Sequence, residues 1–467
     1  ATVMLCGWRA AGAKLRWDVS VRGLRSMTTL PEQQQPQEPH RPGPSWMKNS
    51  GRERLVVLGS GWAAYRIIRD IDIEKYDLTV VSPRNHFLFT PLLPSTTVGT
   101  LEFRGIIEPI RTARSRLNYV QFSCTEIDEE KQQIFCESFY DHGETKIKEN
   151  IKLRYDKLVI AVGAQSGTFG VEGVEDHCYF LKQLSDARLI RNRILECFER
   201  ASSPRVSDEK KRQILSFAVV GGGPTSIEFA ASLHDFCAKD VVKWYPELYP
   251  FVSITVVEAG PKVLSAFEDS LSQYCQKQYK KQNIEIRTNI SVKKVNEDSM
   301  ELSDGSILPF GCGVWSAGNT PVPLLTSLPF EKQGGRLVVD EYLRVGGRTN
   351  IFSAGDCCVV KDNVLPPTAQ VAEQQGKTIA KNLNSSSISP SVVPPMRRFK
   401  FHYRGMFAYT GEFSALLDSP FGTTKGFISW LLYVGTYLTK LVSIRNKIMI
   451  PMYWFKSFVF GRDISKF

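Results

Sequence analysis

Residues 55–64 read LVVLGSGWAA, a short apolar run that ends in a glycine-rich turn. The run predicts a buried strand, and the apolar residues at 63, 64, 67, 68 and 71 predict a helix after the turn. Gly59 permits the tight turn, Gly61 lets the backbone approach a pyrophosphate, and the small Ala64 lets helix and strand pack closely. A G-x-G-x-x-A turn between a strand and a helix predicts a dinucleotide-binding fold.

A second strand–turn–helix of the same kind occupies residues 216–230, which read SFAVVGGGPTSIEFA. Gly221 and Gly223 repeat the first two glycines of the motif, whereas Ser226 stands at the third small position and weakens the match. We therefore expect a second dinucleotide fold. The size of Ser226 affects how closely the helix of this fold packs against the preceding strand.

The residue at the end of the next strand differs between the two folds. Ser82 follows the strand expected at 78–81, whereas Glu258 ends the strand expected at 253–257. A carboxylate there accepts hydrogen bonds from a ribose 2′-hydroxyl and repels a 2′-phosphate. Glu258 therefore predicts a preference for NADH over NADPH, the alternative being an ordinary surface glutamate. Ser82 leaves the adenosine ribose contact of the first fold unassigned.

Three further apolar runs end in glycine turns, at Gly163, at Gly318 and at Gly355. The last of these delivers Asp356, which can accept a hydrogen bond from a ribitol hydroxyl of FAD. Two dinucleotide folds suggest two dinucleotides. A nicotinamide that gives hydride to a flavin fits this arrangement, because the cofactors then carry the chemistry.

The predicted fold class is α/β, with two Rossmann-like dinucleotide-binding domains and a C-terminal amphipathic, membrane-anchoring helical region. We expect the nicotinamide domain to be inserted into the flavin domain. The expected boundaries are 1–50 for a transit peptide and disordered linker, 51–164 and 336–395 for the two parts of the FAD domain, 165–335 for the NADH domain, and 396–467 for the membrane-anchoring and dimerisation region.

The 467 residues have an ordinary globular composition, with 42% hydrophobic and 23% charged residues, which excludes a wholly disordered or collagen-like chain. The net charge of +11 lies mostly in the two ends, because residues 1–50 carry a net +4 and residues 425–467 a net +6. A nucleic-acid-binding protein usually bears its positive charge on the folded domain. We therefore expect no nucleic-acid partner.

The two basic ends predict different things. Residues 1–28 are Arg-rich, acid-poor and amphipathic, which is typical of a mitochondrial transit peptide, although a disordered basic tail has the same composition. Residues 425–467 place ten aromatic residues among seven basic ones, without the run of roughly 18 apolar residues that a spanning helix needs. This pattern favours helices that lie on a lipid surface, and helices that pack in a core or a dimer remain the alternative.

The ten cysteines contain no C-x-x-C pair. This argues against a zinc ribbon and against a disulfide relay beside a flavin, and we expect no metal. A sulfide:quinone reductase would have to use Cys312 and Cys357.

The segments GSGWAAY, SPRNHFLFTPLLPS, GGGPTSIEFA, FSAGDC, PTAQVAEQQG and the tail that ends in GRDIS together resemble the type II (alternative, non-proton-pumping) NADH:ubiquinone oxidoreductases over roughly residues 53–467. The resemblance implies a flavoenzyme that passes electrons from NADH through FAD to ubiquinone without pumping protons. It also implies a homodimer that lies peripherally on the mitochondrial inner membrane, and it leaves the face of that membrane open.

The same resemblance assigns roles to residues. It implies a Glu near the nicotinamide and two glutamines near the flavin ring and quinone, whose amides share a helix face; otherwise the glutamines would cap a helix or face solvent. The three expected catalytic residues are Glu228, Gln370 and Gln374. The expected FAD contacts are Gly59, Gly61, Ala64, Gly163, Gly355 and Asp356. The expected NADH contacts are Gly221, Gly223, Glu258 and Gly318.

Two other functions share the two folds. One is an NADH-dependent reductase of a soluble acceptor, which would not need the aromatic, basic tail. The other is an NADH-sensing flavoprotein similar to the AIF proteins, which would turn over slowly with quinone.

Overall fold

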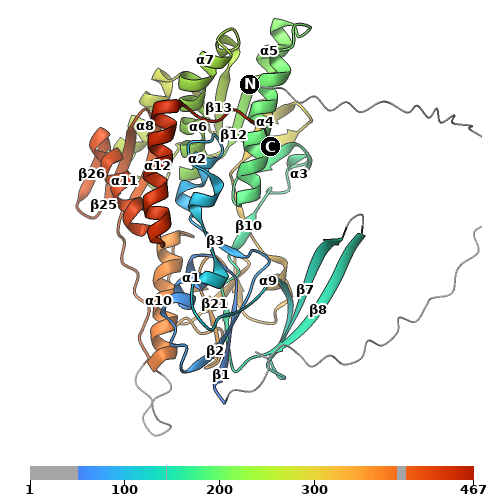
Figure 1. The fold of residues 1–467 in the computed structure, drawn as a ribbon, viewed down its shortest axis with the longest axis vertical. Coiled ribbons are helices and arrows are strands. Elements are labelled where there is room, and N and C mark those ends of the chain that lie inside the picture. Colours follow the sequence, from blue (N-terminus) through green and yellow to red (C-terminus); the bar gives the residue numbers. More distant parts are fainter. Residues whose placement is uncertain (1–50, 143–144, 386–395, 467) are drawn as a thin grey trace, which may run out of the picture. The chain divides into compact units, whose positions relative to one another are not determined.

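The computed structural model describes residues 51–142, 145–385 and 396–466 (Figure 1). The expected transit peptide and linker at 1–50 lie outside the described residues, as do residues 386–395 and 467. The boundaries proposed from the sequence stay predictions.

The first sheet is parallel and has the strand order β22-β9-β1-β2-β5. Residues 55–58 are buried throughout, as expected for a central parallel strand that is covered on both faces. A Cβ at Gly376 would lie 2.5 Å from the carbonyl oxygen of Ala63, so this glycine lets α10 approach α1 closely. The elements are β1 (Glu53–Leu58), α1 (Trp62–Asp70), β2 (Tyr76–Val81), β5 (Asn118–Val120), β9 (Lys157–Ile160), β22 (Ile351–Ser353) and α10 (Ala369–Ser385).

The second sheet is also parallel, with the order β11-β18-β12-β13-β14, and all its strands fall between β9 and β22 of the first sheet. The second domain is therefore inserted into the first, and the expected α/β class with two Rossmann-like dinucleotide-binding domains is confirmed. Its elements are β11 (Cys178–Phe180), α4 (Leu184–Ala201), α5 (Asp208–Ile214), β12 (Ser216–Val220), α6 (Pro224–Phe236), β13 (Ser253–Glu258), α8 (Asp269–Lys281), β14 (Ile284–Thr288) and β18 (Cys312–Trp315).

The two connections between the domains run side by side, because β10 (Ala164–Ser166) pairs antiparallel with β19 (Asn319–Pro321). Small antiparallel sheets complete each domain. They are built from β3 (His86–Leu88) and β4 (Ile107–Pro109); from β6 (Ser123–Asp128), β7 (Gln133–His142) and β8 (Thr145–Arg154); from β15 (Val292–Val295), β16 (Ser299–Leu302) and β17 (Ile307–Pro309); and, with one parallel pair, from β20 (Lys332–Gln333), β21 (Arg336–Val339) and β23 (Cys358–Val360).

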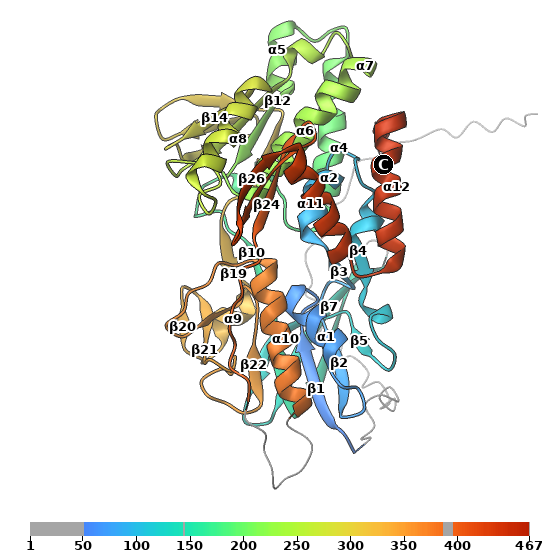
Figure 2. The ribbon, with the colours of Figure 1, turned by 90° about the vertical axis from the view of Figure 1, so that its left-hand side faces the viewer.

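The C-terminal region forms a three-stranded sheet followed by two helices (Figure 2). Its elements are β24 (Met406–Gly411), β25 (Ser414–Ser419), β26 (Gly422–Gly426), α11 (Phe427–Lys440) and α12 (Ile444–Phe460). Within the described residues, neither these nor the other helices are long and apolar enough to cross a bilayer. Both helices nevertheless expose apolar side chains, which belong to Phe427, Ile428, Leu431, Leu432, Ile444, Ile448, Met452, Phe455, Phe458, Val459 and Phe460.

Candidate functional site

A cavity of about 1460 Å³ extends from the first glycine turn to the start of α6 and the loop after β18. Both dinucleotide domains therefore contribute to its walls. Six of the residues predicted from the sequence line it, namely Gly59, Gly61, Gly163, Gly318, Gly355 and Asp356. Ala64 lies buried on α1 behind the turn. The structure thus brings most of the predicted FAD contacts to one cavity, and their contacts with FAD stay predictions.

The two glycine turns have nearly the same backbone. Gly59 has a φ of 116° and Gly221 a φ of 112°, a left-handed region that side chains disfavour. A Cβ on Gly59 would lie 2.2 Å from the carbonyl oxygen of Ala161, and one on Gly221 would lie 3.0 Å from that of Ser316. Gly61 and Gly223 face open space at the start of a helix. Such a turn exposes free backbone N–H groups, which fits a pyrophosphate.

A polar cluster that the sequence did not predict lies at the end of β2. Arg84 donates from Nε to Ser60 Oγ at 3.3 Å and from Nη1 to Gln183 Oε1 at 2.7 Å. Ser82 Oγ donates to Ser60 Oγ at 3.0 Å. Burial lowers the pKa of Arg84 to about 10, and the residue lines the cavity. Because no acid ends β2, this guanidinium is the charged group at the end of the cavity nearest that strand.

The wall of the cavity also carries an acid and a base whose charges interact. Burial raises the pKa of Asp356, and the nearby charge of Lys182 opposes this rise. Lys182 itself has a lowered pKa because it is buried, and its Nζ lies 2.5 Å from Asn319 Oδ1. Lys182 lies just before α4, where no sequence motif distinguishes it. Gln375, also missed, accepts a hydrogen bond from the Gly355 N–H at 2.7 Å and fixes that turn.

Glu258 is held at the end of β13 by the turn that it faces. Its Oε2 accepts the Gly222 N–H at 2.5 Å, and its Oε1 accepts the Gly260 N–H at 2.6 Å. The carboxylate is therefore an ordered part of the second nucleotide turn and not a freely moving surface glutamate. Ser226, at the third small position, is fully buried on α6, and its Oγ has no hydrogen-bond partner among the described residues.

Glu228 is buried on α6, with an exposed fraction of 5%. Burial raises the pKa of its carboxyl to about 8, and the Tyr409 N–H, which donates to Oε1 at 3.1 Å, opposes this rise. Tyr433 and Tyr437 of α11 lie close enough for the charge of Glu228 to raise their pKa values. At neutral pH this carboxyl therefore holds a proton.

Gln370 and Gln374 share one face of α10, as expected, and each holds backbone of the C-terminal region. Gln370 donates to the Gly405 carbonyl at 2.7 Å and accepts the Arg404 N–H at 3.1 Å. Gln374 donates to the His402 carbonyl and accepts the His402 N–H, both at 2.9 Å. Neither amide is left to solvent. Residues 402–409 thus contact both glutamines and Glu228, although Glu228 lies far from the two glutamines in sequence.

The nine described cysteines are free. Cys312 and Cys357 are almost fully buried, and burial raises the pKa of each thiol. A nucleophilic cysteine needs an exposed thiolate, so these two are poor candidates for a thiol relay.

Comparisons with known proteins identify the family of the chain. Residues 53–376 match the pyridine nucleotide-disulphide oxidoreductase family, and residues 403–463 match the NDH2 C-terminal domain. The chain is 44% identical to a probable NADH dehydrogenase of Dictyostelium discoideum, over 89% of this chain and 91% of that protein. It is 39% identical to an internal alternative NAD(P)H-ubiquinone oxidoreductase A1 of Solanum tuberosum, over 90% of this chain and 89% of that protein.

Among solved structures, NDH2 of Plasmodium falciparum in complex with NADH aligns with a TM-score of 0.82 and 28% identity, over 89% of this chain and all of that one. The sequence relatives, the C-terminal domain and this structure agree with one another and with the two nucleotide turns. The chain therefore belongs to the type II, or alternative, NADH:ubiquinone oxidoreductase family.

Proposed function

We propose that the chain oxidises NADH at the second glycine turn and passes the electrons, through FAD held in the cavity, to ubiquinone without pumping protons. The observation that carries this proposal is the single cavity walled by both dinucleotide domains, because hydride transfer requires the two ring systems to meet. The relatives from Solanum tuberosum are named NAD(P)H-ubiquinone oxidoreductases, and these names are the reason for proposing ubiquinone as the electron acceptor.

FAD supplies the electron-accepting ring when it is bound. The chain binds and orients it through Gly59 and Gly61 at the pyrophosphate, Arg84 at the adenosine end and Asp356 at the ribitol. Lys182 places a positive charge on the cavity wall near Asp356, and a cation there favours electrons on an accepting ring.

Glu228, Gln370 and Gln374 are the proposed catalytic residues. Glu228 holds a proton at neutral pH, and reduction of a quinone to a quinol consumes protons, so this neutral carboxyl is the proposed proton donor. Gln370 and Gln374 fix residues 402–405, which lie beside the same α10 helix start that lines the cavity.

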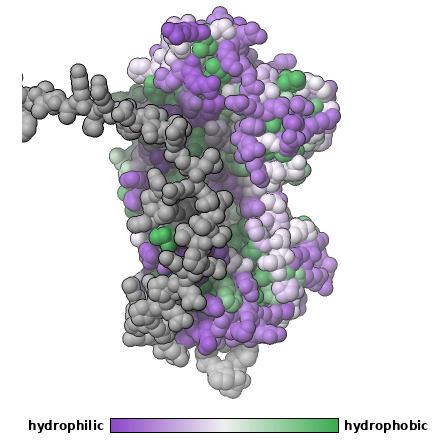
Figure 3. All heavy atoms as spheres, turned by 90° about the vertical axis from the view of Figure 1, so that its right-hand side faces the viewer, coloured by the Kyte–Doolittle hydropathy of each residue, from purple (hydrophilic) through white to green (hydrophobic). Residues whose placement is uncertain are grey.

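The exposed apolar residues of α11 and α12 support attachment to a lipid surface. Along α12, Ile444, Ile448, Met452 and Phe455 recur at helical spacing and are all exposed. The opposite side of the molecule is largely hydrophilic where its atoms are coloured, with apolar atoms scattered among the hydrophilic ones (Figure 3). Since several relatives are mitochondrial, we propose the inner mitochondrial membrane as the location. A homodimer through these helices is part of the same proposal.

The lipid-surface proposal can be tested with Ile448→Gln/Met452→Gln. Both side chains are more than half exposed, so the fold should survive the change. The variant should bleach its flavin with NADH as fast as the wild type, but it should no longer sediment with phosphatidylcholine–cardiolipin vesicles. An exposed apolar change away from α12, Ile307→Gln, is the control. Unchanged sedimentation of the double variant would contradict attachment through α12.

A further inference from the structure

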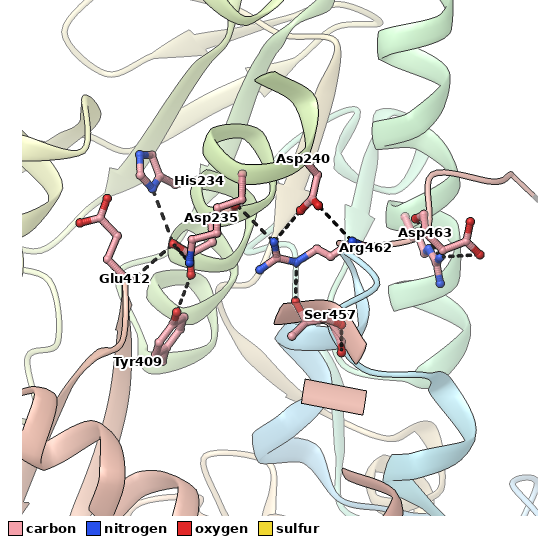
Figure 4. A network of polar contacts seen from close by, with 11 residues as sticks. His234, Asp235, Asp240, Tyr409, Glu412, Ser457, Arg462 and Asp463 are labelled. Carbon is pink, nitrogen blue, oxygen red and sulfur yellow. Dashed lines mark hydrogen bonds and ion pairs between the residues drawn. The ribbon is translucent and has the colours of Figure 1, made fainter. Parts of the chain in front are cut away.

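The end of α6 farthest from the nucleotide turn carries two acids that the fold buries. Asp235 lies in its last turn and Asp240 in the π-helix η5 (Cys237–Val241) that continues it, with exposed fractions of 2% and 1%. Ionised carboxylates at this depth need charged or hydrogen-bonding partners. Most of these partners come from the C-terminal region (Figure 4).

Arg462 is the partner of Asp240 and joins three parts of the chain. Its Nη1 donates to Asp240 Oδ2 at 2.7 Å, and its backbone N–H donates to Asp240 Oδ1 at 3.0 Å. Its Nε donates to Thr100 Oγ1 of the first domain at 2.8 Å. The side chain is only 8% exposed. One guanidinium therefore links the first domain, the second domain and the C-terminal tail.

Asp235 fastens the same helix end to β24. Its carboxylate accepts hydrogen bonds from the Tyr409 hydroxyl and, at 3.1 Å, from the Glu412 N–H. Glu228 and Asp235 are seven positions apart, which is about two helical turns, so both acids lie on the same face of α6. Tyr409 contacts both, since its N–H donates to Glu228 and its hydroxyl to Asp235. Strand β24 therefore lies along α6, and the position of the strand depends on the position of the helix.

We propose that Arg462 is a positioning residue for the reaction: its guanidinium links Asp240 to Thr100 and so keeps α6, with Glu228, packed against β24. Without this Arg462 clasp between Asp240 and Thr100, Asp240 is buried with no charged partner, and we expect α6 to loosen at η5, a rare helix type. The inference rests on the proposed role of Glu228, but the effect of Arg462 on the stability of α6 can be measured whether or not Glu228 has that role.

Displacement of α6 should change the pKa of the Glu228 carboxyl. The titratable groups around its carboxyl are Tyr279 of α8, Tyr409 of β24, and Tyr433 and Tyr437 of α11, all neutral at physiological pH. Burial is therefore the main cause of its raised pKa. Water admitted by a displaced α6 lowers that pKa toward the ordinary range.

The test compares three variants of the purified holoenzyme. Arg462→Lys keeps the charge but loses the fork of donors, and Thr100→Val removes only one arm of the clasp. Lys466→Ala is the matched control, because this tail residue pairs with Glu196 in an exposed ion pair. Hydrogen–deuterium exchange of residues 224–241 and the pH profile of NADH–ubiquinone turnover are measured for each.

We expect Arg462→Lys to speed exchange across 224–241 and to lower kcat, each on the order of tenfold, with the alkaline limb of the profile moved to lower pH. Thr100→Val should act in the same direction but less, and it decides the matter if Arg462→Lys does not fold. Lys466→Ala should change neither readout. Faster exchange confined to 457–466, or faster exchange in α6 with an unchanged pH profile, would overturn the proposal while leaving the proposed oxidoreductase activity untouched.

Discussion

The two glycine turns have the same backbone but differ in the residues around them. Gly59 and Gly221 have φ values within a few degrees of each other, and each donates its N–H to the end of the next strand, at 2.8 Å in both. The first turn faces Ser82 and Arg84, whereas the second faces the carboxylate of Glu258. We therefore expect the turn to hold a pyrophosphate in both, and the residues at the end of the next strand to decide which nucleotide binds.

The helices that follow the turns also differ. Counted from the first glycine, Arg66 on α1 corresponds to Glu228 on α6. Arg66 is partly exposed and pairs with Asp70 and Glu373, whereas Glu228 is buried beneath the C-terminal region. If the first turn holds FAD and the second admits NADH, as proposed, the buried acid lies on the helix of the turn that binds the substrate.

We expect the largest difference between the two turns when the first glycine of each, Gly59 or Gly221, is replaced by alanine. Gly59→Ala places a Cβ 2.2 Å from a carbonyl oxygen, whereas Gly221→Ala leaves 3.0 Å, so the first change is the more severe. Gly59→Ala should retain less than about a tenth of the wild-type flavin. Gly221→Ala should keep its flavin and show a raised KM for NADH. Flavin absorbance per protein checks this, and equal flavin loss in both variants would break the comparison.

Glu258→Gln should act on the nucleotide alone. The amide loses the negative charge and one of the two oxygens that accept the Gly222 and Gly260 N–H groups, so the KM for NADH should rise about tenfold, and discrimination against NADPH should fall. Steady-state kinetics with both nucleotides measure this. Glu285→Gln on the neighbouring strand β14 is the control. An unchanged NADPH/NADH ratio would show that Glu258 does not read the ribose.

Arg84→Met should act on FAD alone. Losing its guanidinium weakens the adenosine end of the cavity, and FAD affinity should fall about fivefold, with the KM for NADH unchanged. Titration of the apoenzyme with FAD, followed by flavin fluorescence, gives the affinity. If the KM for NADH changed and flavin affinity did not, Arg84 would belong to the other nucleotide.

The smallest effect concerns Glu228 and stability. Its pKa rises from 4.5 to about 8 on folding, so its neutral form contributes stability fully below pH 4.5, and this contribution is lost as the pH rises through about 8. Glu228→Gln has no such loss, so its melting temperature should exceed that of the wild type by about 2 °C more at about pH 9 than at about pH 6. Parallel melting curves at the two pH values would mean that the carboxyl is not buried as described.

The sequence predicts what local chemistry determines. Glycine spacing and hydrophobic periodicity are local signals. They were enough to predict both strand–turn–helix units, the strand ends at Glu258 and Asp356, and the apolar tail. Arg84 was missed because a lone Arg after Ser-Pro carries no such signal. Lys182 and Arg462 were missed because their partners lie in other domains, and only the folded chain brings them together.

The most direct test of the account is anaerobic mixing of the wild-type holoenzyme with NADH, followed by a short-chain ubiquinone, with NADPH in parallel. The account predicts fast bleaching of the flavin by NADH, slow bleaching by NADPH, and fast return of the flavin colour when the quinone is added. Fast bleaching by NADH without recovery on quinone would leave both nucleotide sites standing and would contradict the assignment of ubiquinone as the acceptor.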